Sequence, residues 1–230
     1  MEVKLISHTP EPEKVVAAAA RLCYSPKSAV EIMEDFGSAE VETFLNKLTE
    51  MGHDSPLEHA SFTFAIDGVS RALSHQLVRH RIGVSFSQKS QRYVKERHFE
   101  YHTPPAIAKN EAALDRYQQV MANLAKAYDE LLALGIPAED ARYLLPNAAT
   151  TNFVLTMNAR SLLHFFQLRC CIRAQAEIRE LAYLMREEVR QVAPHLFAKA
   201  GPTCETRLKK RTKSLQHSRM NMKSGHQRDL

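Results

Sequence analysis

The chain has 230 residues and a formal net charge of +5, and 44% of its residues are hydrophobic. This length and apolar content predict one folded domain with its own core and exclude a mainly disordered chain. No stretch reaches the roughly 20 apolar residues of a membrane helix, and the first residues lack a signal-peptide pattern, so we expect a cytoplasmic protein.

The positive charge is concentrated at one end. Residues 205–230 hold eight basic and two acidic side chains, so this tail carries +6 and the rest of the chain −1. A nucleic-acid-binding surface on the body is therefore disfavoured. The tail has little apolar content and no periodicity, and we expect it to be disordered.

The N-terminal half alternates short strands with amphipathic helices. Apolar patterning predicts, in chain order, a strand over 2–7, a helix over 11–22, a helix over 39–51, a strand over 60–66 and a helix over 69–79. A polar stretch, Ser85 to Val94, follows and is expected to be extended.

The C-terminal half is dominated by helices. The pattern predicts a long helix over 106–134, a strand over 150–157, a helix from the cap Asn158 to about Arg169, and an amphipathic helix over 174–192. The fold class is therefore α+β: a single domain, residues 1–204, with a small mixed or antiparallel sheet packed against long helices, followed by the basic tail 205–230.

Several familiar sites are absent from the sequence. The four cysteines (Cys23, Cys170, Cys171 and Cys204) form no CxxC pair, so we expect reduced thiols. The histidines lack HExxH spacing, and no metal site is expected. Without GxGxxG or GxxxxGK[ST], any bound phosphate must rely mainly on arginines and helix N-termini.

Two clusters of polar residues remain as candidates for chemistry. The first is Gln76-Leu-Val-Arg79-His80-Arg81 followed by Ser85 to Tyr93. On a helix Gln76 and Arg79 share a face, arginine suits phosphates and carbonyls, and in an extended segment Ser90 and Arg92 would point to the side opposite Gln91 and Tyr93. This cluster fits a nucleotide site, although composition alone fits a solvated basic helix end equally well.

The second cluster is the helix that begins at Asn158. Its free N–H groups offer an anion site. At about 100° per residue, Arg169 returns to nearly the face of Asn158 but lies opposite Arg160. The helix can therefore serve two ligands, and the alternative is a core helix whose arginines extend into solvent.

Together these segments resemble the flavin-dependent thymidylate synthase family. The family signature, RHR, seven residues and then Ser, is matched by Arg79-His80-Arg81 and Ser90-Gln91-Arg92-Tyr93. Further matching segments are Ser55-Pro-Leu-Glu-His-Ala60, Ala141-Arg142-Tyr-Leu-Leu-Pro146, Met157-Asn-Ala-Arg-Ser-Leu162 and Leu168-Arg169 with Ala174-Gln-Ala-Glu-Ile-Arg179.

The resemblance implies an enzyme with FAD that methylates dUMP, with 5,10-methylenetetrahydrofolate and NADPH as co-substrates, in a homotetramer with shared active sites. It implies that FAD contacts Ser55, Arg79, His80, Arg81, Gln88, Asn158, Arg160 and, where many members carry an amide, His164. It implies that dUMP contacts Gln76, Arg79, Gln88, Ser90, Gln91, Arg92, Arg142 and Arg169. Arg169 is the expected catalytic residue, because a fixed guanidinium would stabilise negative charge on the uracil carbonyls. For Ser90 we favour a hydrogen-bonding role over a nucleophilic one.

One irregularity and two alternatives remain. Eight residues, Ile82 to Lys89, separate Arg81 from Ser90, and we expect a local loop near Gly83 to absorb the extra residue. The alternatives are an RNA-binding protein that uses the tail, and a flavoprotein oxidoreductase that does not methylate.

Overall fold

The computed structural model describes residues 1–202, without the side chains of Ser38 and Thr49. Its centre is one four-stranded sheet in the order β1-β2-β4-β3, with every neighbouring pair antiparallel. The strands are β1 Glu2–His8, β2 Ser61–Ser70, β3 Val84–Gln88 and β4 Thr150–Asn158. The α+β class is confirmed, and the sheet is antiparallel rather than mixed.

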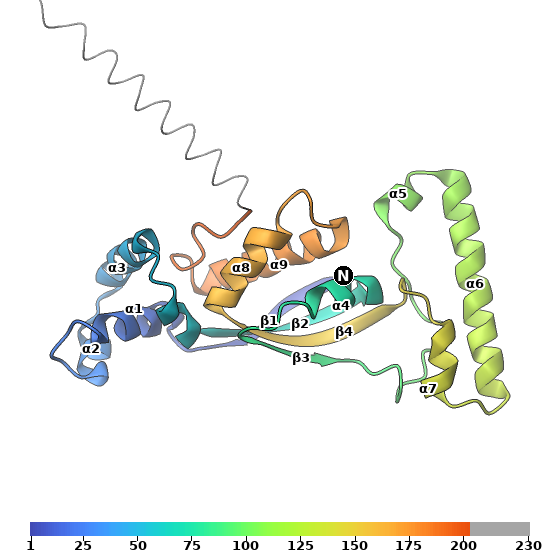
Figure 1. Ribbon diagram of the computed structural model, residues 1–230, viewed down its shortest axis with the longest axis horizontal. Coiled ribbons are helices and arrows are strands. Elements are labelled where there is room, and N and C mark those ends of the chain that lie inside the picture. The colour runs from blue at the N-terminus through green and yellow to red at the C-terminus, as the bar shows by residue number, and fades with distance from the viewer. Residues whose placement is uncertain (203–230) are drawn as a thin grey trace, which may run out of the picture.

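Helices cover one face of this sheet (Figure 1). They are α4 Arg71–Leu77, α8 Ala159–Arg169 and α9 Ala176–Val192. Alternate residues of the central strands point into this layer, so that Phe62 and Phe64 of β2 and Leu155 and Met157 of β4 are fully buried. This main core holds the start of α8 and the end of α4 in place.

A group of helices flanks each end of the sheet (Figure 1). At one end lie α1 Pro12–Leu22, α2 Ala29–Asp35, α3 Ser38–Met51 and the short turn η1 Ser55–His59. At the other end lie α5 Pro105–Ala108, α6 Glu111–Ala133, α7 Ala138–Ala141 and η2 Arg142–Leu144. We call residues 99–149 the arm. It has a smaller core of its own around Phe99, Met121 and Ala149.

Two of the predicted helices have wrong boundaries, and a polar cap explains each. The helix predicted over 69–79 is the shorter α4, because the side chain of Ser70 accepts the Leu73 N–H at 3.0 Å and begins the helix there. The long helix predicted over 106–134 is interrupted, because Asn110 caps a separate α6 by accepting the Ala113 N–H at 3.0 Å.

The segment predicted to be extended from Ser85 to Val94 is a strand only as far as Gln88. Beyond it the Val94 N–H donates to the Ser90 carbonyl at 2.9 Å, and the Arg92 N–H donates to Ser90 Oγ at 3.2 Å. A serine that satisfies nearby backbone groups competes with a strand ladder. The predicted alternation of faces from residue 90 onward is therefore wrong.

Helix α2 was missed, although its sequence holds a start signal. The Ser28 side chain accepts the Glu31 N–H, and the Glu31 carboxylate accepts the Ser28 N–H at 2.7 Å. This capping box is readable as Ser-x-x-Glu.

Two further predictions concern membrane-spanning helices and the C-terminal tail. None of the helices in residues 1–202 is both long and apolar enough to cross a membrane. The predicted tail 205–230 and the domain boundary at residue 204 lie outside the described residues.

Candidate active site

The start of α8 is locked to the turn that follows the RHR segment. Asn158 caps the helix by accepting the Ser161 N–H at 2.9 Å, as predicted. Its own N–H donates to the Gly83 carbonyl at 3.1 Å, and Ser161 Oγ donates to the Ile82 carbonyl at 2.6 Å. These bonds place the turn directly over the helix N-terminus.

Gly83 is required at this turn. Its φ is +63°, and a Cβ there would lie 2.3 Å from Asn158 Nδ2 and 2.7 Å from Ser161 Oγ. From Val84 to Gln88 the pairing with β4 has no irregularity. A change of length at Ile82–Gly83 therefore leaves the strand register intact, in line with the expectation for the extra residue.

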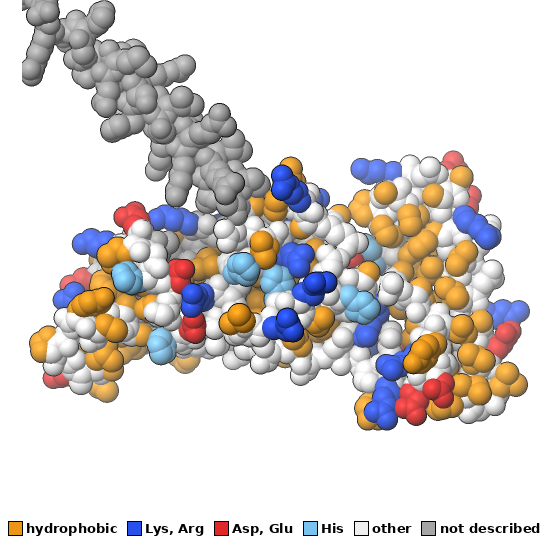
Figure 2. Space-filling view, in the orientation of Figure 1, with side chains coloured by type: hydrophobic (Ala, Val, Ile, Leu, Met, Phe, Trp, Pro, Cys, Tyr) orange, Lys and Arg blue, Asp and Glu red, His pale blue; other side chains and the backbone are white. Residues whose placement is uncertain are grey.

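A cavity of about 480 Å³ opens beside this junction. Most of the predicted flavin contacts line it, together with Glu58, Ile82, Val84 and Ser161; they are Arg79, His80, Arg81, Asn158, Arg160 and His164. Figure 2 shows basic side chains and histidines gathered on this face over α4 and α8. Arg160 is paired with Glu58 at 2.5 Å, whereas no ion pair is formed by Arg79 or Arg81 within residues 1–202. The cavity is thus a cationic site at a helix N-terminus, suited to an anionic ligand.

Arg169, at the other end of α8, is held in a fixed orientation. Its Nε donates to His80 Nε2 at 3.0 Å, and its Nη2 donates to the Gln76 carbonyl at 3.3 Å. Neither bond uses Nη1. Burial, and then the charge of Arg79, lower the pKa of Arg169, but a guanidinium stays protonated in proteins.

His80 is neutral at physiological pH. Burial, followed by the charges of Arg169 and His164, lowers the pKa of His80 to about 4. Because Nε2 accepts from Arg169, the ring proton lies on Nδ1. His80 therefore acts as an acceptor that orients Arg169.

This environment predicts a pH dependence of stability. Between about pH 6.5 and pH 4 the unfolded chain binds a proton at residue 80 that the folded chain does not, so the free energy of unfolding falls as the pH falls through this window. Replacement by glutamine keeps an acceptor but cannot titrate. We expect the apo protein with His80→Gln to lose less stability than wild type from pH 6.5 to 4, measured by urea unfolding. The exposed His53→Gln is the control, and equal slopes for wild type and His80→Gln would contradict the assignment.

The remaining predicted substrate residues gather at the base of the arm, around Glu139 of α7. Arg92 Nε donates to the Glu139 carboxylate at 2.7 Å, and Arg142 Nε donates to the Glu139 carbonyl at 3.1 Å. Gln91 is buried, with 8% of its surface exposed, and its Nε2 has no partner within residues 1–202. Together with Ser90 these residues form what we call the arm cluster. Figure 2 shows basic and acidic side chains side by side in the region of α7.

Arg71 belongs with this cluster and was missed from the sequence. It is half-buried at the start of α4, and burial, followed by the charge of Arg142, lowers its pKa, while Glu96 raises it. A signal was available, because a positive charge in the first turn of a helix opposes the helix dipole. Such a conflict between a residue and its helix indicates that the residue serves a purpose other than stabilising the helix.

A single chain does not unite the two groups. None of the arm cluster lines the 480 Å³ cavity, and neither does Gln88, whose Nε2 instead lies 3.3 Å from Thr151 Oγ1. Ser55 begins η1 beside Asp54, which lines an adjoining cavity that shares Arg160 and His164.

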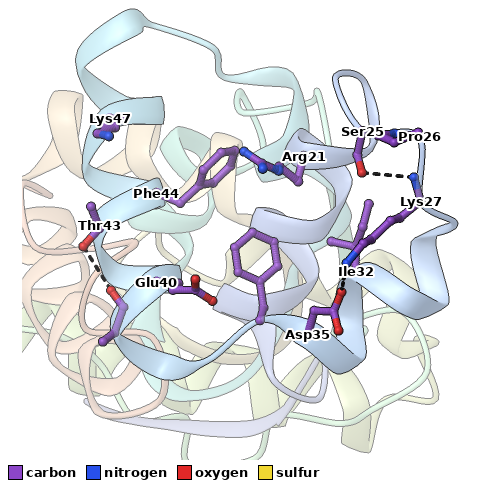
Figure 3. Close-up of a pocket in the computed structure, with 12 residues that line it drawn as sticks. Arg21, Ser25, Pro26, Lys27, Ile32, Asp35, Glu40, Thr43, Phe44 and Lys47 are labelled. Carbon is purple, nitrogen blue, oxygen red and sulfur yellow. Dashed lines mark hydrogen bonds and ion pairs between the residues drawn. The ribbon is translucent and has the colours of Figure 1, made fainter.

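A larger cavity lies elsewhere. About 880 Å³ in volume and open to solvent, it is lined by residues of α1, α2, α3 and their connections, and Figure 3 shows Arg21, Phe44 and Lys47 around it. Its Asp35 is paired with Lys27 at 2.5 Å, and Glu40 accepts the Gly37 N–H at 3.3 Å. Because no predicted site residue lines it, size alone does not mark the active site here.

Comparisons with known proteins show the family of this chain. A family model described as "Thymidylate synthase complementing protein" matches residues 4–195. A flavin-dependent thymidylate synthase from Clostridium tetani is 50% identical over 220 residues, covering 89% of this chain and 88% of that protein. Another, from Geobacter sulfurreducens, is 52% identical over 208 residues, covering 90% and 89%. The chain belongs to the flavin-dependent thymidylate synthase family.

A solved structure shares the fold of this family member. The UMP/dUMP methylase PolB from Streptomyces cacaoi, bound with 5-Br dUMP, superposes with a TM-score of 0.71 at 24% identity, covering 86% of this chain and 93% of that one. The range matched by the family model contains every predicted site residue, from Ser55 to Arg169. Both clusters thus lie in the part of the chain that it shares with its relatives.

Proposed function

We propose that the protein transfers a one-carbon unit from 5,10-methylenetetrahydrofolate to C5 of dUMP to give dTMP, with FAD as cofactor and NADPH as reductant. Membership of a family of enzymes with this name supports the reaction. The observation that carries it is the preset guanidinium of Arg169, held by His80 and the Gln76 carbonyl beside a cationic cavity.

The residues around the 480 Å³ cavity fit FAD. A flavin dinucleotide carries a diphosphate, and the α8 N-terminus together with Arg79 and Arg81 supplies donors for it. His80, His164 and the apolar Ile82 and Val84 offer surfaces for a flat ring. When bound, the flavin supplies the hydride that completes the methyl group.

Arg169 is proposed to activate the nucleotide. C5 of uracil becomes nucleophilic only as negative charge builds on the ring carbonyls, and a guanidinium that is already oriented stabilises this charge without reorganising. Nη1 is the nitrogen left for that role. Ser90 is proposed to bind rather than attack, because within residues 1–202 the contact of its Oγ is the Arg92 N–H and not a base.

We infer that a second copy of the chain completes the site. The arm cluster, with Arg92 and Arg142 poised for a phosphate, lines no part of the cavity that contains Arg79. A homotetramer in which the arm of one subunit reaches the cavity of another unites the two groups, and an isologous contact would form equivalent sites in pairs.

The reaction has a direct test. The purified protein should be yellow from non-covalently bound FAD, and it should release tritium from [5-³H]dUMP only when methylenetetrahydrofolate and NADPH are both present. A yellow protein without dUMP-dependent release would instead be the non-methylating flavoprotein. A colourless protein that takes up no FAD on titration would exclude both the methylating enzyme and the non-methylating flavoprotein. It would favour the RNA-binding alternative.

A further inference from the structure

The N-terminus of α9 clamps α4 at both of its ends. At the first end, the Glu177 carboxylate accepts the Ser70 N–H at 2.7 Å and the Ser70 hydroxyl at 2.5 Å. Ser70 in turn caps α4 through the Leu73 N–H. Glu177 is buried, with 2% of its surface exposed, so these charge-assisted bonds are shielded from water and fix where α4 starts.

At the second end, two residues before Glu177, lies Gln175. Its side-chain carbonyl Oε1 accepts a hydrogen bond from Nε2 of Gln76, in the last turn of α4. The segment that carries Gln175 is itself fixed, because Arg179 Nη1 donates to the carbonyls of Ile172 at 3.1 Å and Ala174 at 3.4 Å. The backbone of Gln76 is held from a third direction, through its carbonyl, by Arg169.

These contacts decide which half of the Gln76 amide is free. A glutamine offers two N–H donors and one carbonyl acceptor, and either half can face a ligand if the amide is free to turn over. Here one N–H of Nε2 donates to Gln175, which fixes the orientation of the amide, and within residues 1–202 the carbonyl Oε1 has no partner and is available to accept. The side chain is thereby preset as an acceptor.

We propose that Gln175 is a positioning residue for substrate specificity: it orients Gln76 so that the site accepts a nucleotide that presents a hydrogen-bond donor at this point. The inference rests on the proposed function, in which Gln76 contacts dUMP. Two groups of dUMP can donate, the ring N3–H and the ribose 3′-hydroxyl. The unprotonated N3 of dCMP is an acceptor and would face the Gln76 oxygen without a hydrogen bond, and rejection of unmatched polar groups is a strong source of specificity.

The holoenzyme with Gln175→Met tests the proposal. Methionine keeps the length of the side chain but removes the acceptor, so the Gln76 amide can turn over. We expect KM for dUMP to rise about five-fold, the loss of roughly one hydrogen bond, with kcat and the flavin absorption spectrum unchanged. Gln175→Glu keeps an acceptor for Nε2 and should restore KM. Gln191→Met, at an exposed position near the other end of α9, is the matched control.

A second variant, at Gln76 itself, distinguishes a loss of Gln76 orientation from a general disturbance of the site. In a Gln76→Glu enzyme either carboxylate oxygen is an acceptor, so adding Gln175→Met should change KM for dUMP no further. An equal penalty in both backgrounds would overturn the proposal, as would a Gln175→Met enzyme that behaves like Gln191→Met. Either result would leave the proposed function standing, because wild-type tritium release tests that separately.

Inhibition constants of two analogues identify the donor. If the ring N3–H donates, Gln175→Met weakens dUMP and 2′,3′-dideoxyuridine monophosphate but not dCMP. If the 3′-hydroxyl donates, it weakens dUMP and dCMP but not the dideoxy analogue. Both outcomes support the orientation of Gln76, whereas equal weakening of all three nucleotides contradicts it.

Discussion

Replacing Arg169 with alanine is expected to lower kcat for dTMP formation by about 10²-fold or more, the usual effect of removing one preorganised donor from a developing negative charge. The structure adds a reason for so large a loss. The Nε and Nη2 groups of Arg169 already donate to His80 and the Gln76 carbonyl, so the orientation of Arg169 is fixed before substrate binds. Single-turnover tritium release from [5-³H]dUMP measures the step directly.

Two further variants make this result specific. Arg169→Lys should recover little activity, because an ammonium cannot reproduce the fork that bonds two partners and leaves a third nitrogen free. Arg173→Ala, an exposed position in the loop after α8, should turn over normally. An inactive Ser90→Ala enzyme beside a normal Arg169→Ala enzyme would reverse the roles given to these two residues.

Mixing two inactive variants is expected to restore activity. If Arg79 and Arg142 of one active site come from different subunits, Arg79→Ala and Arg142→Ala are each inactive alone. Unfolding and refolding them together at equal amounts should give about a quarter of the wild-type sites, because each site draws its two arginines independently. The measurement is turnover of the refolded mixture, with each variant refolded alone as the control.

The opposite outcome is equally clear. If both arginines of a site belonged to one chain, every chain in the mixture would carry a defect and the mixture would stay inactive. The separation of the arm cluster from the cavity within one chain would then need a change of conformation, with the arm closing on its own α8.

Much of this fold can be predicted from the sequence, because the signals for its strands and helices are local. Alternating apolar residues predict β2 and β4, where Phe62, Phe64, Leu155 and Met157 fill the core, and Asn158 predicts the start of α8. Errors occur where a short side chain bonds its own backbone. Such a bond changes the course of the chain at Ser70, Asn110 and Ser90. The periodicity of apolar residues carries no information about these bonds.

The assembly of the site could be predicted only in part. The RHR segment and α8 meet as expected, because the turn at Gly83 and the cap at Asn158 bond each other. The position of Arg142 beside Arg92 depends on Glu139, a residue whose sequence context carries no signal for this role. Gln175 was overlooked for the same reason, since its partner Gln76 lies 99 positions away in the chain, whereas Arg71 carried a signal in its conflict with the helix dipole.

The two cores described above have a consequence for how such an enzyme diverges. The main core supports α8 and the cavity, whereas Phe99, Met121 and Ala149 support the arm, and within residues 1–202 no buried residue belongs to both cores. Substitutions in the arm core are therefore expected to shift Arg142 while leaving Asn158 and its helix undisturbed. Under the proposed function, natural variation in the arm would change the contacts with the nucleotide phosphate without changing the residues proposed to hold the cofactor.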